Sequence, residues 1–138
     1  MRRFTLLFFL TLALSLALVA CGGDDGGDSE PAGEASAARG EELYKQTAIG
    51  AASAPGCITC HSIEADIVLV GPPHVGIATK AETAVSGVSV TEYLEQSIVD
   101  PNAVITDGFS PGVMYQNYGS DLTDQEVADL VAFLETLK

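Results

Sequence analysis

The chain has 138 residues and a formal net charge of −13, with six basic residues against 19 acidic ones. This length favours one domain rather than two. An acidic surface repels nucleic acid, so the composition argues against a nucleic-acid-binding protein. It either favours basic partners, with contacts that weaken as salt is added, or serves only to keep the protein soluble.

The first 20 residues have the features of an export signal. Arg2 and Arg3 make a short basic start, and residues 4–20 are seventeen uncharged positions, mostly Leu, Phe and Ala. That is short for a membrane span of about 20 residues but suits the apolar region of a signal peptide. With Cys21 directly after it, the segment resembles a bacterial lipobox, in which the cysteine is lipidated; an uncleaved anchor helix is the alternative. We expect an exported domain, lipid-anchored through Cys21 to the membrane and facing the periplasm or the cell exterior.

The residues after Cys21 predict a link between the membrane and the domain. Gly, Asp, Ser, Glu and Pro are prominent in residues 22–37, which is typical of a flexible acidic tether. Loss of residues 1–20 would leave four basic residues against 19 acidic ones, a net charge of −15. We therefore predict a signal peptide over 1–20, a lipidated cysteine and tether over 21–37, and a domain over 38–138.

The first part of the domain is predicted to be a helix followed by loops. Partly periodic apolar residues predict a helix over 38–49, and the small residues and proline of 50–56 end it. The apolar run 67–70 ends at two prolines, and no partner strand for it is visible. We interpret this run as an extended loop that covers a hydrophobic group.

A capping box predicts the next helix. Ser89 and Glu92 have the spacing that satisfies the first free N–H groups of a helix, which predicts a helix over Val90–Val99. Residues 101–120 are rich in Gly, Pro, Asn, Ser and Asp, and we expect a loop there.

A second capping box, from Thr123 and Glu126, predicts the last helix over Asp124–Leu137, with a continuous apolar stripe. The prediction is then three or more helices and long loops in about 100 residues, which is little core for that size. We therefore expect a non-protein group at the centre.

The motif with the most specific chemistry is Cys57-Ile58-Thr59-Cys60-His61. Its C-x-x-C-H pattern is that of c-type haem attachment. Two thiols three residues apart suit addition to two vinyl groups of one porphyrin. The histidine that follows is then placed to bring its Nε2 atom to the iron.

Two other readings of the cysteine pair are a redox-active disulfide and a zinc site. A thioredoxin-like pair expects a βαβ context and usually a nearby tryptophan, and the chain has no Trp. Zinc needs four ligands, and beyond Cys57, Cys60 and His61 only His74 is available. We therefore predict one covalent haem c. With Cys21 taking lipid, all three cysteines are used and none remains for a disulfide.

Two residues compete for the second axial position on the iron. Met114 is the only methionine left after signal removal and lies in a Gly/Pro loop 53 residues after His61. His74 follows His61 by 13 residues and would have to cross to the far face within that span. Although an isolated methionine is usually ordinary core, we favour Met114, because His/Met ligation raises the potential and suits an electron carrier.

From Ala38 to Lys138 the chain resembles class I, mono-haem cytochromes c. The matching residues are ARGEELY, CITCH, VGPP, the 90–99 helix ending in DPNA, SPGVM, and DLTDQEVADLVAFLETL. It is similar to small membrane-anchored bacterial cytochromes c and to the cytochrome c domain of some haem–copper oxidase subunits II. The resemblance implies an all-α cytochrome c fold, with three to four helices and long loops wrapped around one covalently bound haem.

The resemblance also implies roles for residues outside the motif. Gly40 and Tyr44 would cross the last helix near Phe133, with the two rings packed edge to face. The carbonyl that precedes Pro72 would accept a hydrogen bond from the Nδ1–H of His61 and so fix its tautomer.

Met114 matches the distal ligand of the family, which often has proline directly after it; this chain has Tyr115 there. We expect Tyr115 and Tyr118 either to donate hydrogen bonds to a haem propionate or to pack as rings. The expected wall of the haem and core consists of Ile58, Ile63, Val68, Val70, Val75, Leu94, Ile98, Val113, Leu130 and Phe133.

These features predict an electron carrier rather than an enzyme, since no base–nucleophile pair is visible. We expect a monomer whose single haem iron cycles between ferric and ferrous, between respiratory or photosynthetic redox complexes. Its partners would be a quinol-oxidising complex and a terminal oxidase. The alternatives are a haem c sensor or ligand-binding protein, a peroxidase-like enzyme, and a c-type subunit of a larger oxidoreductase complex.

Overall fold

The computed structural model describes residues 33–138; the predicted signal peptide, Cys21 and most of the tether lie outside the described residues. In chain order the elements are α2 (Ala37–Tyr44), β1 (Ala48–Ile49), β2 (Ala54–Pro55), the 3₁₀ helix η1 (Cys57–Thr59), α3 (Ile77–Ala84), α4 (Val90–Val99), α5 (Tyr118–Asp121) and α6 (Asp124–Leu134). The predicted all-α class is confirmed. Residues 33–138 also contain one antiparallel hairpin, whose two strands have two residues each. Within residues 33–138, no helix combines the length and apolar character needed to cross a membrane.

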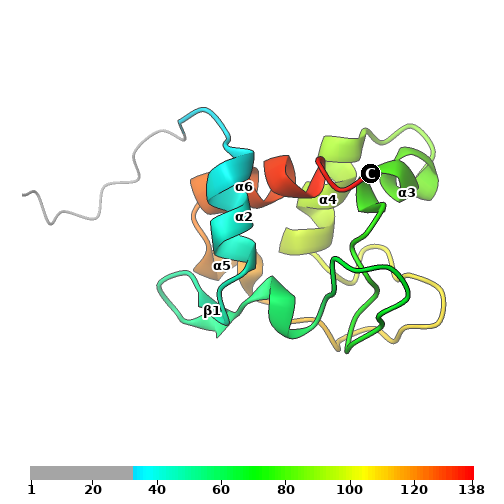
Figure 1. Ribbon diagram of the computed structural model, residues 1–138, viewed down its shortest axis with the longest axis horizontal. Coiled ribbons are helices and arrows are strands. Elements are labelled where there is room, and N and C mark those ends of the chain that lie inside the picture. The colour runs from blue at the N-terminus through cyan, green and yellow to red at the C-terminus, as the bar shows by residue number, and fades with distance from the viewer. Residues whose placement is uncertain (1–32) are drawn as a thin grey trace, which may run out of the picture.

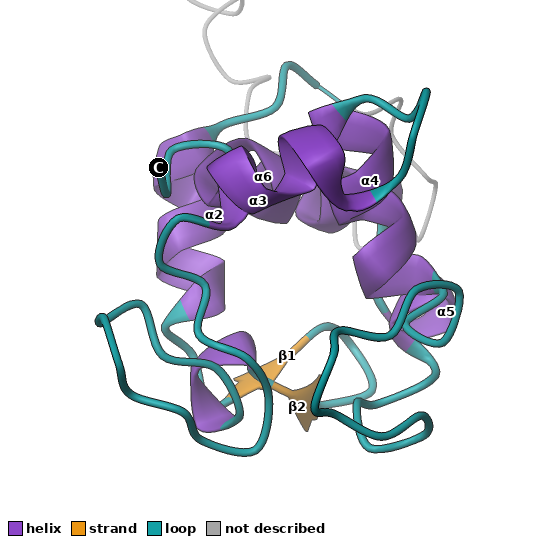
Figure 2. Ribbon diagram, turned by 90° about the vertical axis from the view of Figure 1, so that its right-hand side faces the viewer, coloured by secondary structure: helices purple, strands orange, loops and turns teal. Residues whose placement is uncertain are grey.

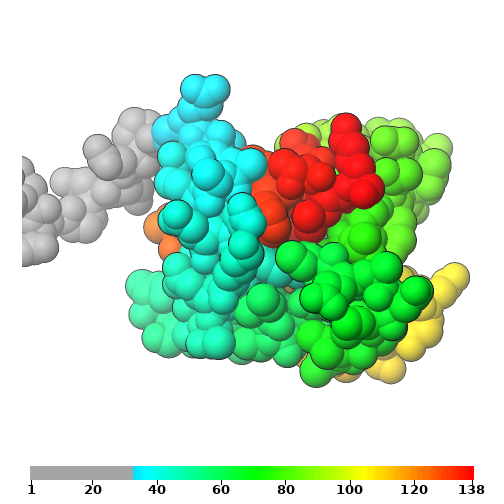
Figure 3. Space-filling model, viewed as in Figure 1, coloured from blue at the N-terminus to red at the C-terminus, as the bar shows by residue number. Residues whose placement is uncertain are grey.

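Helices α2 and α6 pack directly against each other, and Figures 1 and 3 show the first helix lying beside the last. A Cβ atom at Gly40 would lie 1.8 Å from the backbone oxygen of Asp129, so this approach requires glycine. The ring of Tyr44 packs on Phe133 as a tilted pair, with centroids 5.3 Å apart and planes inclined by 59°. The predicted contact of the first helix with the last is confirmed.

Both predicted capping boxes are present. The side chains of Ser89 and Thr123 each accept the N–H of a glutamate three residues on, and that glutamate accepts the N–H of the capping residue. Helix α4 therefore has its predicted bounds, and α6 begins where predicted. It ends at Leu134 rather than at the predicted Leu137.

The first helix is shorter than predicted, because it ends at Tyr44 and not at residue 49. Ala48 and Ile49 instead pair antiparallel with residues 54–55. Gly50 turns the chain between them with a φ of 69°, in the left-handed region that glycine adopts without strain. The apolar side chain of Ile49 is buried through this hairpin, not through a helix face.

Two helices were not predicted. Helix α3 begins after Gly76, which has a φ of 69° and supplies no side-chain cap, and only two alanines of the helix are buried. It therefore lacks both a start signal and an apolar stripe. Helix α5 is a single turn at the end of the predicted loop 101–120 and extends one residue past it.

The run 67–70 is a loop, as predicted, but its side chains face solvent. Ile67, Val68 and Leu69 are 42%, 60% and 48% exposed. Figure 2 shows α2, α6 and α4 as an arch, with the hairpin and the long loops closing the opposite side. The site lies between the arch and these loops.

Candidate functional site

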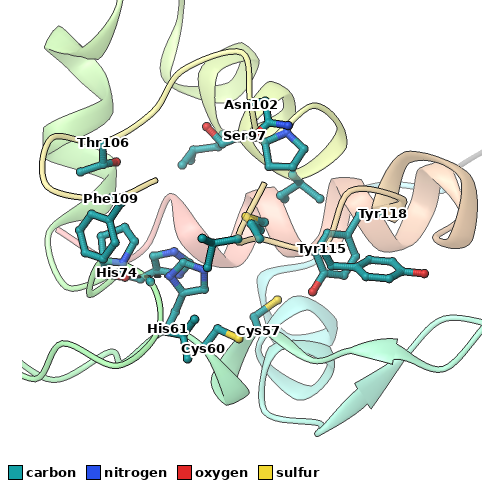
Figure 4. A pocket seen from close by; sticks show the side chains of 18 of the residues that line it. Cys57, Cys60, His61, His74, Ser97, Asn102, Thr106, Phe109, Tyr115 and Tyr118 are labelled. Atoms are coloured by element: carbon teal, nitrogen blue, oxygen red, sulfur yellow. Dashed lines mark hydrogen bonds between the residues drawn. The ribbon is translucent and has the colours of Figure 1, made fainter. Parts of the chain in front are cut away.

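A cavity of about 300 Å³ lies between the helical arch and the loops, and its lining is mostly apolar. The helices contribute Ile77 from α3, Leu94 from α4 and Leu130 from α6. Cys57, Cys60, His61, His74 and Met114 also line the cavity. Figure 4 shows the two cysteines and both histidines on one side of it, with Tyr115 and Tyr118 farther along.

The cysteine motif forms a tight turn at the edge of the cavity. The N–H groups of Cys60 and His61 both donate to the carbonyl of Cys57, at 3.1 and 2.9 Å. This turn brings both free thiols to the same cavity. Burial raises the pKa of the Cys57 thiol to about 11. Before any thioether link is formed, this side chain is therefore a neutral thiol at pH 7.

His61 is buried, and one of its nitrogens is already engaged. Its Nδ1 atom lies 2.8 Å from the carbonyl oxygen of Pro72. The acceptor is the carbonyl of Pro72 itself, not the preceding one that was predicted. Burial lowers the pKa of His61, and the Pro72 carbonyl only partly offsets this. A neutral imidazole that donates through Nδ1 has Nε2 available for a metal.

Gly71 allows the chain to pass close to this histidine. A Cβ atom at residue 71 would lie 2.4 Å from Cε1 of His61. The Gly71 N–H also donates to the carbonyl of Cys60 at 2.9 Å, which closes the loop 61–70. Gly71 was not predicted as a site residue, although its place before two prolines indicates a constrained turn.

His74 stacks on His61, with ring centroids 4.0 Å apart and planes inclined by 20°. Its Nδ1 atom lies 3.2 Å from the Tyr44 hydroxyl, which also lies 3.3 Å from the His61 carbonyl oxygen. Burial lowers the pKa of His74 to about 3, with the neighbouring His61 and Lys80 adding to the effect. Two axial ligands of one iron approach it from opposite faces of the haem, whereas these two rings are stacked face to face with no room for a haem between them. His74 is therefore not placed as the partner ligand of His61.

Met114 reaches the cavity from the loop between α4 and α5, where it is partly buried against the core. It is thus brought together with Cys57, Cys60 and His61, which come from the opposite end of the domain sequence. Of the two candidates for the distal position, Met114 is the one that enters the cavity from a segment distant in sequence from His61.

The two tyrosines near Met114 use their hydroxyl groups within the protein. Tyr115 donates to the carboxylate of Asp121 at 2.6 Å, and Tyr118 donates to the carbonyl of Pro55. Their rings pack edge to face, with centroids 5.1 Å apart. A hydroxyl has one proton to donate. The ring packing that was expected as the alternative is present, and the hydrogen bonds to a propionate stay a prediction.

The predicted wall is only partly correct. Leu94, Ile98 and Leu130 are buried and line the cavity, while Val70 and Val113 line it although they are more than half exposed. Phe133 is buried against Tyr44 instead. Ile58, in η1, and Val68 are exposed to solvent and do not line the cavity.

Several polar residues that line the cavity were not predicted. Ser97, Asn102 and Thr106 lie along it, and Figure 4 shows them opposite the cysteines. Asn102 belongs to the DPNA segment, where an asparagine directly after a helix-ending proline is a signal for a side chain that contacts backbone.

The helical arch, the cysteine turn and the apolar cavity define a protein that holds a covalently attached haem. The family model for cytochrome c matches residues 37–138, and the chain belongs to the cytochrome c family. Haem-based electron transfer is the function of this family, and its cofactor is covalent haem c with iron. A search of curated proteins gave no significant match.

The residues present fit this cofactor. Two thiols at the mouth of an apolar cavity can form its thioether links, and a buried, neutral imidazole with its Nδ1 engaged can ligate iron through Nε2. Cys57 and Cys60 would hold the group covalently, and His61 would be its proximal ligand. The thioredoxin-like and zinc readings of the cysteines are set aside, because the family match covers the whole domain.

Proposed function

We propose that this chain is a membrane-tethered electron carrier with a single haem c ligated by His61 and Met114. The observation that supports it most is the convergence of Cys57, Cys60, His61 and Met114 on one apolar cavity. The haem iron, when bound, supplies one-electron chemistry by alternating between the ferric and ferrous states.

The protein side of this function is to hold the iron with both axial positions taken. The turn at Gly71-Pro72 orients His61, and a thioether ligand from Met114 favours the reduced state and a higher potential. An iron with two protein ligands has no open position for a small molecule. This distinguishes a carrier from a haem c sensor or a peroxidase-like enzyme.

We also propose how the carrier meets its partners. The exposed apolar loop 67–69 adjoins Val70, which lines the cavity, and it follows the exposed acidic residues Glu64 and Asp66. A partner with an apolar site and a basic rim would fit this surface, with association that weakens as salt screens the charges. A quinol-oxidising complex and a terminal oxidase are the partners we propose. We also propose that the protein is a monomer, in which no second copy covers this surface.

The tether is the second part of the proposal. A lipid on Cys21 would keep the exported domain at the membrane surface, facing the periplasm or the cell exterior, with residues 22–37 as the linker. Radiolabelled fatty acid should enter the wild type and not Cys21→Ser, and the variant should leave the membrane fraction. Equal labelling and equal membrane retention would contradict the lipid anchor.

Carbon monoxide binding separates a carrier from a sensor. The ferrous holoprotein should bind carbon monoxide slowly or not at all, while exchanging electrons rapidly with a soluble redox mediator. Rapid, tight binding by the untreated ferrous protein would overturn the closed-iron assignment. Stable co-purification with other redox subunits would instead identify a c-type subunit of a larger complex, with the same chemistry at the iron.

A further inference from the structure

The loop that carries Met114 has little backbone hydrogen bonding of its own. Within the described chain, no backbone–backbone hydrogen bond outside the helices and strands involves residues 110–116. Gly112 within it has a φ of 75°, and Val113 is 55% exposed. The residue after Met114 is Tyr115, so no proline restricts the backbone there. Contacts made by side chains must therefore hold this segment in place.

One side chain contacts the loop on both sides of Met114. The Oδ1 atom of Asn102 accepts the N–H of Gly112 at 2.8 Å. The Nδ2 atom of Asn102 donates to Oε1 of Gln116. The Nε2 atom of Gln116 in turn donates to the carbonyl oxygen of Met114. These three bonds form a closed relay from Gly112 through Asn102 and Gln116 back to Met114.

Asn102 is well placed to act as the fixed end of this relay. It follows Pro101 at the end of α4, where a turn is closed by the Ala103 N–H donating to the carbonyl of Asp100 at 3.0 Å. Helix α4 packs on α3, α5 and α6. The relay therefore ties a segment with few backbone hydrogen bonds to a helix end that the rest of the domain holds.

We propose that Asn102 and Gln116 are positioning residues that hold the Met114 loop in its ligand-presenting conformation. This inference rests on the proposed role of Met114 as distal ligand. The relay replaces the local restraint that a proline after the ligand would give. Its loss should let the sulfur leave the iron more often, without unfolding the domain.

Imidazole competition on the ferric holoprotein measures how often the sulfur leaves. Imidazole binds only when Met114 has left, so its apparent affinity is scaled by the open population. Asn102→Ala should bind imidazole about tenfold more tightly than wild type, as expected for the loss of one to two hydrogen bonds at an exposed site. Gln116→Ala should show a smaller change in the same direction, because it keeps the Asn102–Gly112 bond.

A matched control and a double variant test the relay itself. Gln96 lies exposed on α4, and no side-chain hydrogen bond of Gln96 occurs in the described chain, so Gln96→Ala should bind imidazole as wild type does. The Asn102→Ala/Gln116→Ala double variant should differ little from Asn102→Ala alone, because both changes break the same relay. Guanidinium unfolding should show similar midpoints for all variants, which separates loop opening from general destabilisation.

Met114→Ala is measured first, so that two kinds of failure are distinguished. If it binds imidazole no better than wild type and keeps the wild-type spectrum, Met114 is not the ligand, and both proposals are overturned. If Met114→Ala binds imidazole strongly but Asn102→Ala and Gln116→Ala match Gln96→Ala, the relay proposal alone is overturned. Tighter binding by both relay variants, with unchanged unfolding midpoints, supports it.

Discussion

The Nδ1 atom of His61 lies 2.8 Å from the carbonyl oxygen of Pro72. The preceding Gly71 donates its N–H to the carbonyl of Cys60, the residue before the histidine. One short turn therefore closes the loop around His61 and orients its ring. Because a ligating imidazole is fixed by what its other nitrogen contacts, this turn would determine how Nε2 is presented to a haem iron.

A methyl group at residue 71 tests this arrangement. In Gly71→Ala the new Cβ would lie 2.4 Å from Cε1 of the buried His61 ring, so the ring or the turn must move. We expect less haem per chain, an altered axial-ligand spectrum, and an unfolding free energy lower by about 1–3 kcal/mol, typical of overpacking. The pyridine haemochrome assay and absorbance spectra of the purified protein measure the first two.

Gly33→Ala is the control, since its Cβ would meet only the end of the Gln125 side chain, at 3.2 Å. Equal haem content and identical spectra in the two alanine variants would contradict a positioning role for Gly71.

Removal of His74 tests whether it is an axial ligand. It stacks on His61, and its Nδ1 contacts the Tyr44 hydroxyl, so we expect His74→Leu to keep the wild-type axial-ligand spectrum. Its unfolding free energy should fall by about 1 kcal/mol for the lost hydrogen bond. Low-temperature electron paramagnetic resonance of the ferric protein is the measurement, with Met114→Ala as the reference for a lost ligand. A His74→Leu spectrum like that of Met114→Ala would show that His74 binds the iron.

The crossing of α2 and α6 gives a stability prediction. Gly40→Ala would place a Cβ 1.8 Å from the backbone oxygen of Asp129, which cannot move without shifting α6. We expect the unfolding free energy to fall by about 3 kcal/mol or more in denaturant titrations. Glu42→Ala, on the exposed face of α2, should change it by less than about 0.5 kcal/mol. Equal midpoints for the two variants would contradict the close crossing.

Asp129 gives a prediction for acid stability. Burial alone would raise the pKa of this carboxyl, but Arg39, the Ser36 N–H and Gln125 outweigh burial and hold the pKa below its ordinary value of 3.8. A carboxyl with a lowered folded-state pKa stabilises the fold above its unfolded pKa, and this contribution is lost as pH falls through the folded value. Stability should therefore decline below about pH 4.

The variant Asp129→Asn isolates this contribution, since it keeps the size of the side chain and removes its charge. Its unfolding free energy should be lower than that of wild type at pH 7, and the two should converge as the pH falls below 4. Asp107→Asn, at an exposed loop position, is the control and should follow wild type. A constant difference between wild type and Asp129→Asn from pH 7 to pH 3 would argue against the depressed pKa.

The parts of the fold with strong local signals were predictable. The capping boxes at Ser89 and Thr123 located the starts of α4 and α6, because a helix start is decided by a few neighbouring side chains. Helix α3 has an alanine-rich face and a glycine N-cap, so its formation depends on tertiary packing that local spacing does not reveal. The first helix was predicted too long because the burial of Ile49 comes from pairing with residues 54–55.

The site likewise has residues that a local sequence motif predicts and residues that only tertiary packing brings together. Cys57, Cys60 and His61 are contiguous and carry their chemistry in one motif, whereas Asn102 and Gln116 acquire a role only when the loop folds back on α4. The contacts that the hydroxyl groups of Tyr115 and Tyr118 make within the protein could not be predicted for a similar reason. Their partners, Asp121 and the Pro55 carbonyl, are set by the packing of α5 against the hairpin loop rather than by the local pattern.

The most direct test of the proposed carrier is a spectroelectrochemical titration of the wild-type holoprotein beside Met114→Ala. The wild type should show one reversible one-electron transition and a weak far-red ferric band from sulfur on iron. In the variant the band should disappear, and the midpoint potential should fall by on the order of 0.1 V, within the ~0.8 V that axial ligands span. A variant that keeps both the band and the potential would contradict His61/Met114 ligation and the closed iron that depends on it.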